Sequence, residues 1–153
     1  MSTPQTRPLV AVDVGNTRMK FGLFDPASLT GAGVPEPVRT LGLAADEPLD
    51  ELAAWLAPHP PASLAWWIGT VNLITSTRLI AWLRDNDAAG RVTMLSAPDL
   101  PLEVRLPRPD MVGIDRLLAA VTANRLRDPK RPAVIVDLGT AISYWIDPDD
   151  PDE

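Results

Sequence analysis

The chain has 153 residues, of which 46% are apolar, and this is enough for one domain of ordinary size with a hydrophobic core. Lysine and arginine number 14 against 20 aspartate and glutamate residues, so the net charge of −6 argues against a broad binding surface for nucleic acid or anionic membranes. Because there is no cysteine, a disulfide framework, a thiol nucleophile and a thiolate metal site are excluded.

Residues 1–8 are polar and contain proline, without the basic start and apolar stretch of a signal peptide. No apolar run approaches the length of a membrane span. We therefore expect a cytoplasmic protein that binds neither membrane nor nucleic acid.

The hydrophobic pattern predicts a hairpin followed by alternating helices and strands. Residues 9–14 form an apolar run broken only by Asp13, and residues 18–24 alternate polar and apolar side chains. The further predicted elements are a strand at 37–43, a helix at 46–57, a strand at 64–71, a helix at 74–87 ended by Gly90, a strand at 91–95, a helix at 110–127 and strands at 133–137 and 141–146. Strands and helices in this order predict a mixed α/β sheet.

The predicted helices carry apolar residues at helical spacing, which indicates one inward face each. The residues expected on these faces are Leu49, Leu52, Ala53, Leu56, Leu79, Ile80, Leu83, Ile114, Leu117, Leu118 and Val121. Trp66 and Trp67 are adjacent in a predicted strand, so they should point to opposite faces, one into the core and one toward a helix or partner. A nucleobase platform is the less favoured alternative.

Two predicted strands end in a carboxylate followed by a glycine turn. Residues 13–17 read Asp-Val-Gly-Asn-Thr, and residues 137–141 read Asp-Leu-Gly-Thr-Ala. A carboxylate at a strand end can hold Mg²⁺, and the glycine lets backbone N–H groups approach phosphate oxygens. This pairing predicts two halves of a phosphate clamp and hence nucleotide chemistry.

A third block, residues 113–116, reads Gly-Ile-Asp-Arg and opens a predicted helix just upstream of the second glycine turn. In this order and spacing, residues 13–20, 113–116 and 137–141 resemble the first phosphate motif, the Gly-x-Asp-Arg motif and the second phosphate motif of the type III pantothenate kinases. That family belongs to the superfamily of acetate and sugar kinases, heat-shock chaperones and actin.

The resemblance implies a ribonuclease-H-like mixed sheet flanked by helices, in a kinase whose two such domains face each other across a nucleotide cleft. It divides the chain into an N-terminal ribonuclease-H-like domain at 1–130 and the start of a second, truncated domain at 131–153, of which only the first hairpin is present. The chain is then a truncated fragment or a natural half-protein, and we expect it to be inactive alone.

The activity implied by the resemblance is transfer of the γ-phosphoryl group of ATP to the terminal hydroxyl of pantothenate, the first step toward coenzyme A. In this scheme Asp115 accepts the hydroxyl proton, while Gly113, Ile114 and Arg116 contact the substrate.

The same resemblance implies the cofactor contacts. The residues implied to bind ATP are Asp13, Val14, Gly15, Asn16, Thr17, Lys20, Gly139 and Thr140. Asp13 and Asp137 would hold Mg²⁺, or for Asp137 the monovalent cation, K⁺ or NH₄⁺, that the family often requires. Family kinases are usually dimers, which implies a homodimer through the third helix.

Several of these residues have a structural explanation as well. Asp13 is also explained as the cap of a turn, and Asp115 as a carboxylate that offsets a helix dipole. Lys20 is also explained as a solvated strand residue on the same face as Arg18. His59, the only histidine, lies among prolines and is not expected to bind metal or act in catalysis.

Two single residues and one four-residue segment depart from the family pattern. Leu106 stands where the family often carries Tyr, Trp145 fills a position that is usually polar or acidic, and residues 69–72 read Gly-Thr-Val-Asn in place of Ser-Val-Val-Pro. These departures bear on pantothenate recognition more than on nucleotide binding. The alternative function is a non-catalytic regulatory or interaction homologue of the same fold, and a sugar or acetate kinase relative is a weaker one.

Overall fold

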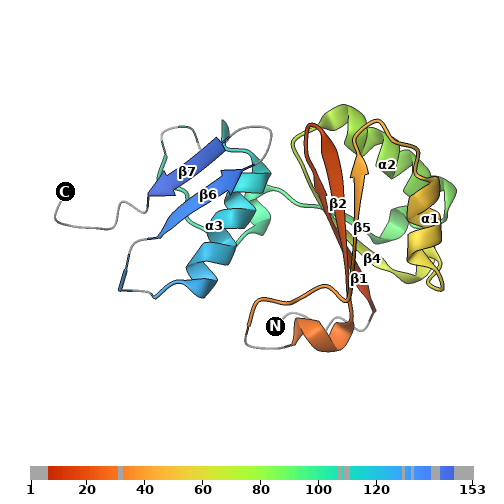
Figure 1. The fold of residues 1–153 in the computed structure, drawn as a ribbon, viewed down its shortest axis with the longest axis horizontal. Helices are drawn as coiled ribbons and strands as arrows, with labels where there is room; N and C mark the ends of the chain where they lie inside the picture. Colours follow the sequence, from red (N-terminus) through yellow and green to blue (C-terminus); the bar gives the residue numbers. More distant parts are fainter. Residues whose placement is uncertain are drawn as a thin grey trace. The chain divides into compact units, whose positions relative to one another are not determined.

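A computed structural model describes residues 7–30, 33–106, 108, 111–128, 130–131, 133–138 and 142–146, without the side chains of 137–138 and 142–146. The chain divides into two compact units, Met1–Leu95 and Ser96–Glu153. Figure 1 shows a sheet with two helices in the first unit, and a helix with a hairpin in the second. The mixed α/β architecture predicted from the sequence is confirmed.

The first unit is built on a five-stranded sheet with β1 at its centre. The strands are β1 (Leu9–Val14), β2 (Arg18–Phe24), β3 (Arg39–Ala44), β4 (Ala65–Thr70) and β5 (Val92–Met94), in the spatial order β3-β2-β1-β4-β5. The pairs β1–β2 and β2–β3 are antiparallel, whereas β1–β4 and β4–β5 are parallel. The sheet therefore changes from antiparallel to parallel at β1.

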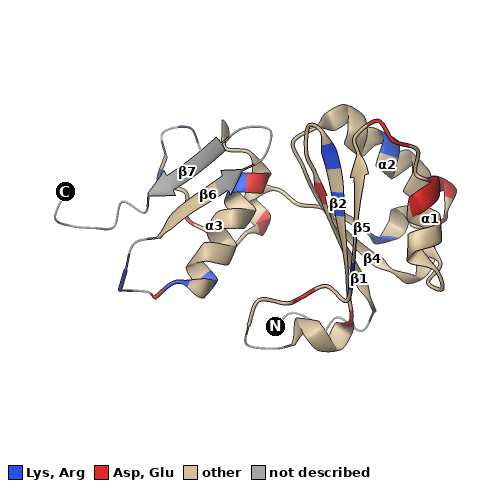
Figure 2. Ribbon diagram, in the orientation of Figure 1, with Lys and Arg blue, Asp and Glu red and all other residues tan. Residues whose placement is uncertain are grey.

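The first hairpin has the bounds that the sequence predicted. Met19, Phe21 and Leu23 are buried in β2, while Arg18 and Lys20, which alternate with them, are exposed. These two basic residues are the blue positions on β2 in Figure 2. The period of two thus separates a core face from a polar face.

Two helices, α1 (Asp50–Leu56) and α2 (Leu73–Asp85), follow β3 and β4 respectively. The predicted helix at 74–87, with Gly90 as its stop signal, is wrong at its end, because α2 ends at Asp85 and Asn86 is its C-cap. Asp87 takes the left-handed conformation at φ 57°, which aspartate tolerates better than most residues. Gly90 lies instead in a following short 3₁₀ turn.

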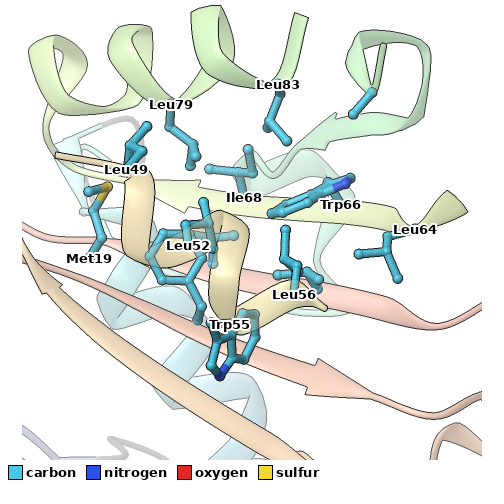
Figure 3. Packing of buried hydrophobic residues seen from close by; sticks show 14 of the residues in the cluster. Met19, Leu49, Leu52, Trp55, Leu56, Leu64, Trp66, Ile68, Leu79 and Leu83 are labelled. Carbon is cyan, nitrogen blue, oxygen red and sulfur yellow. The ribbon is translucent and has the colours of Figure 1, made fainter. Parts of the chain in front are cut away.

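The helices α1 and α2 pack on one face of the sheet, as the close view in Figure 3 shows. The buried side chains labelled there include Met19, Leu49, Leu52, Trp55, Leu56, Leu64, Trp66, Ile68, Leu79 and Leu83. Trp66 is fully buried whereas Trp67 is 45% exposed, so the two tryptophans point to opposite faces as predicted. The other sheet face carries Asp13, Lys20 and Trp67 as exposed residues.

The second unit contains α3 (Ile114–Leu126) and the antiparallel hairpin of β6 (Val134–Leu138) and β7 (Ile142–Ile146). The helix contacts β6. Leu117 is buried, as predicted for the inward face of this helix. The division into compact units groups α3 with the hairpin. The predicted domain boundary at 130/131 instead assigns α3 to the N-terminal domain, and this boundary stays a prediction.

Short 3₁₀ turns connect several of these elements. They are η1 (Pro26–Leu29), η2 (Pro61–Ser63), η3 (Ala89–Arg91) and η4 (Ala97–Asp99). The longest described helices, α2 and α3, have 13 residues each, and no helix in the described part of the chain has the length and apolarity to cross a bilayer.

Candidate functional site

The turn between β1 and β2 is tight, and Gly15 makes it so. The Gly15 N–H donates to the carbonyl oxygen of Arg18 at 2.9 Å. A Cβ atom built on Gly15 would lie only 3.2 Å from the same oxygen, so a larger residue would push the two backbone segments apart. Asn16 and Thr17 at the tip are exposed. The turn therefore presents backbone and short polar side chains at its surface.

Val14 contributes to this region through its backbone. Its side chain is fully buried, and its carbonyl oxygen accepts a hydrogen bond from the Val71 N–H at 3.0 Å. This bond continues the β1–β4 pairing into the segment that leads to α2. The predicted ATP-binding residue Val14 thus has its side chain in the core.

Asp13 and Lys20 face each other across the β1–β2 pair. Lys20 Nζ lies 3.4 Å from Asp13 Oδ2, and the two side chains are 70% and 49% exposed respectively. Gly69 is the partner of Asp13 on the other side, in β4, and adds no side chain there. The structure therefore brings a carboxylate and an ammonium group together beside the glycine turn.

Asn72, the N-cap of α2, links that helix to the turn. Its Oδ1 accepts from the Thr75 N–H at 3.1 Å, which is the normal N-cap bond, and its Nδ2 donates to the carbonyl oxygen of Asn16 at 3.4 Å. One side chain thus caps a helix and contacts the turn.

Arg78, six residues further along the chain in α2, reaches the same region through Ala45. Its Nη2 donates to the Ala45 carbonyl oxygen at 2.7 Å, and the Ala45 N–H donates to the Thr17 carbonyl oxygen at 2.9 Å. Arg78 Nε is buried, and no group in the described residues accepts a hydrogen bond from it. Sequence reasoning did not identify Asn72 or Arg78; the preference of asparagine for helix starts was a signal for Asn72 alone.

The Gly-Ile-Asp-Arg block lies at the beginning of α3. Gly113 is the N-cap, and its carbonyl oxygen accepts from the Arg116 N–H at 3.1 Å. Asp115 Oδ1 also accepts from this N–H, at 2.9 Å, so the carboxylate is held over the first turn. Ile114 and Asp115 are partly buried and Arg116 is exposed. The structure thus groups the four residues predicted to handle the acceptor.

The second phosphate motif is described in part. Asp137 lies in β6 and pairs with Ser143 of β7, but its side chain lies outside the description. Gly139 and Thr140 also lie outside the described residues. The predicted convergence of Asp13 and Asp137 joins residues of the two separate units and stays a prediction.

The described residues contain no group of three or more His, Cys, Asp or Glu side chains that could hold a metal ion. A Mg²⁺ ion bound with a nucleotide usually needs only one or two carboxylates, because phosphates and waters complete its coordination. The exposed carboxylate of Asp13 fits this requirement.

Comparison with known proteins identifies the family of this chain. The family model described as type III pantothenate kinase matches residues 9–147, which include all three motif blocks. The chain belongs to the type III pantothenate kinase family. The family resemblance predicted from the sequence is confirmed.

Three relatives called type III pantothenate kinase illustrate the similarity. The protein of Verminephrobacter eiseniae is 30% identical over 139 residues, that of Paramagnetospirillum magneticum 29% over 149, and that of Oleidesulfovibrio alaskensis 32% over 141. The alignments cover 88%, 89% and 86% of this chain, and 52%, 52% and 51% of the relatives. The chain spans about half the length of the pantothenate kinases it matches.

Proposed function

We propose that this chain forms the nucleotide-binding N-terminal part of a kinase that transfers the γ-phosphoryl group of ATP to pantothenate, giving 4′-phosphopantothenate. The observation that carries the proposal is the family match over residues 9–147, because it spans the three motif blocks in one alignment. Membership of a phosphotransferase family implies ATP as the donor, and the β1–β2 turn supplies a matching site.

The sheet supports a ribonuclease-H-like domain as the finer description of the fold. Strands β1, β2 and β3 form an antiparallel meander, and β4 and β5 extend the sheet in parallel on the other side of β1. Helix α1 connects β3 to β4, and α2 connects β4 to β5. This order places the β1–β2 turn beside the start of α2. The nucleotide phosphates in our proposal lie at this edge of the sheet.

The turn contributes hydrogen-bond donors and little bulk. Phosphoryl transfer is catalysed mainly by positioning and by electrostatic stabilisation, so a tight turn with exposed polar groups and little side-chain bulk suits it. Gly15 lets the two arms of the turn approach each other closely, and Asn16 and Thr17 add exposed polar side chains. Lys20 adds a positive charge next to Asp13.

Asp13 is the proposed ligand of Mg²⁺ in this unit, and Asp137 the proposed second acidic group. When bound, the ion neutralises charge on the phosphates. Without a bound metal ion, Lys20 pairs with the Asp13 carboxylate on the exposed face of the sheet. Since this ion pair is solvated, exchanging it for a metal ion costs little.

Asp115 is the proposed acceptor of the proton that leaves the pantothenate hydroxyl. Its Oδ1 is bound to the Arg116 N–H, which fixes the carboxylate at the start of α3 and leaves Oδ2 to face the hydroxyl. Arg116 supplies a forked cationic donor for the acceptor or its phosphate, and Gly113 provides a backbone without a side chain beside them.

The test is an ADP-release assay on the full-length gene product, with and without pantothenate. We expect ADP release that depends on pantothenate, on Mg²⁺ and on ATP, and no turnover from the 153-residue chain alone. ATP binding without pantothenate-dependent release would contradict the proposal and favour the non-catalytic homologue. Release with another acceptor alcohol in place of pantothenate would favour the sugar or acetate kinase relative.

Three further properties belong to the same proposal: stimulation by K⁺ or NH₄⁺, assembly as a homodimer through α3, and a cytoplasmic location. The first is tested by replacing K⁺ with Na⁺ in the assay, where a loss of rate is expected. The second is tested by light scattering of the full-length product, where twice the monomer mass is expected. The third is tested by fractionation of cells that produce it.

A further inference from the structure

We infer that Asn72 and Arg78 of α2 are positioning residues for the nucleotide, because together they fix the direction of the two carbonyl groups at the tip of the β1–β2 turn. The inference rests on the proposed function and deepens it. In this inference, α2 sets the orientation of the backbone amides that bind phosphate. This helix lies outside the three family motifs.

Two carbonyl groups at the tip of the turn are held by groups outside it. The Asn16 carbonyl oxygen accepts from Asn72 Nδ2 at 3.4 Å, and the Thr17 carbonyl oxygen accepts from the Ala45 N–H at 2.9 Å. In a planar trans peptide the N–H points opposite to the C=O. Holding these carbonyls therefore sets the direction of the N–H groups of Thr17 and Arg18, away from α2 and Ala45.

Ala45 is itself held by α2. Arg78 Nη2 donates to the Ala45 carbonyl oxygen at 2.7 Å, a short bond with a charged donor. Ala45 passes this restraint to the turn, because its own N–H is bound to the Thr17 carbonyl. The chain of contacts is Arg78 to Ala45 to Thr17.

The burial of Arg78 shows that this contact has a cost. Its Nε is buried without a hydrogen-bond acceptor among the described residues, and an unpaired buried donor is unfavourable. A methionine would keep the apolar stem and avoid that cost. The contact of Arg78 Nη2 with the Ala45 carbonyl oxygen, which restrains the turn, explains why this position carries arginine.

The helix is a suitable anchor. It has 13 residues, and Leu79 and Leu83 fix it to the sheet as fully buried side chains. Asn72 and Arg78 are therefore attached to a well-packed helix, and in our inference the carbonyl groups of the turn take their direction from that helix.

The first pair of variants separates the contact of Arg78 from its bulk. Arg78→Met in the full-length gene product keeps the stem and removes the donor, so we expect the KM for ATP to rise roughly tenfold, as for loss of a charged hydrogen bond, with the KM for pantothenate within about twofold. Arg78→Lys keeps a cationic donor and should recover most of the affinity. Arg84→Met is the matched control, because Arg84 lies on the same helix with a side chain 71% exposed and pairs with Asp85.

The second pair separates the two roles of Asn72. Asn72→Ser keeps an acceptor for the Thr75 N–H but removes the Nδ2 donor, because serine caps helices as well as asparagine does. We expect unchanged thermal stability and a KM for ATP raised roughly threefold, as for loss of a neutral hydrogen bond. Asn72→Ala should raise the KM similarly and lower the melting temperature as well.

A purely structural role would have a different signature. It would lower the amount of active enzyme, and hence the apparent kcat, while leaving the KM for ATP at the wild-type value. Equal KM values for ATP in Arg78→Met and Arg84→Met would overturn the inference. So would an Arg78→Lys variant that binds ATP no better than Arg78→Met.

A measurement without nucleotide separates this inference from the proposed function. In the 153-residue chain we expect Arg78→Met to shift and broaden the backbone amide NMR signals of Gly15 to Arg18, and Arg84→Met to leave them unchanged. A full-length wild-type product that does not bind Mg·ATP would reject the proposed function. In that case the amide signals of the 153-residue chain would still show whether α2 orders the turn. Unchanged amide signals in Arg78→Met would reject the anchoring itself.

Discussion

Lys20 Nζ lies 3.4 Å from Asp13 Oδ2 across the β1–β2 pair, and both side chains are largely solvated. An ion pair of this kind contributes about 0–1 kcal/mol to stability. Its residues are therefore free to serve another purpose, and the position of Asp13 next to the glycine turn suits a metal ligand.

We predict that Asp13→Asn leaves the free energy of unfolding within about 1 kcal/mol of wild type and weakens Mg·ATP binding at least tenfold. Urea denaturation and calorimetric titration of the full-length product measure the two effects. Asp85→Asn is the matched control, since Asp85 forms an ion pair of similar length, 3.3 Å, with Arg84 and is also exposed. Equal Mg·ATP affinities in the two variants would remove Asp13 from the metal site.

The carboxylate of Asp115 leads to a prediction about turnover. Asp115→Asn keeps the size of the side chain and its contact with the Arg116 N–H through the amide oxygen, but it cannot accept a proton. We expect kcat of the full-length enzyme to fall about a hundredfold or more, with the KM for ATP nearly unchanged. Steady-state kinetics with circular dichroism as a folding control test this. Near-normal turnover would exclude Asp115 as the proton acceptor.

The adjacent tryptophans of β4 give a matched pair for stability. Trp66 is fully buried and its Nε1 donates to the Pro61 carbonyl oxygen at 3.1 Å, whereas Trp67 is 45% exposed. Trp66→Phe should lower the free energy of unfolding by about 1–3 kcal/mol, through a cavity and an unpaired carbonyl, and Trp67→Phe by less than about 0.5 kcal/mol. Urea titrations followed by far-ultraviolet circular dichroism compare them. Equal losses would mean that the two faces of β4 are buried alike.

Asp99 provides a prediction for pH dependence. Its carboxylate accepts hydrogen bonds from the Ser96 hydroxyl and the Ser96 N–H, at 2.5 and 2.8 Å, and these lower the pKa of Asp99 below its usual value of 3.8. A pKa lowered by folding means that the charged carboxylate stabilises the fold above about pH 4 and that this contribution is lost as the pH falls through the lowered pKa.

Removing the hydroxyl by Ser96→Ala should raise the pKa of Asp99 toward its usual value without fully restoring it, because the bond from the backbone N–H remains. Carbon-13 NMR titration of the carboxyl group gives both pKa values. The pH-dependent part of the stability difference between the variant and wild type should vanish at pH values below both of them, because Asp99 is then protonated in both proteins. An unchanged pKa of Asp99 in the variant would show that the hydroxyl does not determine it.

The strands of the first hairpin were predicted to the residue, since alternation of polar and apolar side chains in β2 depends only on local sequence. The first helix was predicted at 46–57 but begins at Asp50. Residues before it form a turn in which Glu47 Oε2 accepts from the Ala44 N–H at 2.9 Å, and this side-chain bond competes with a helical turn.

The candidate site was predictable only where its residues follow one another in sequence. The turn after Asp13 and the first turn of α3 could be read as short motifs. Asn72 is 56 residues from Asn16, and Arg78 is 33 residues from Ala45, so their contacts exist only after β4 has paired with β1. A pattern search along the chain does not detect contacts that the sheet creates.

The central place of β1 has a consequence for synthesis of the protein. The apolar strand Leu9–Val14 can pair with β2 as soon as Phe24 is made, but its other edge is paired only by Ala65–Thr70. A nascent polypeptide therefore carries an open, hydrophobic strand edge until translation has passed Thr70, and such edges recruit other chains. Products of premature termination before that point are expected to aggregate, and chaperone capture should be strongest in the same interval of translation.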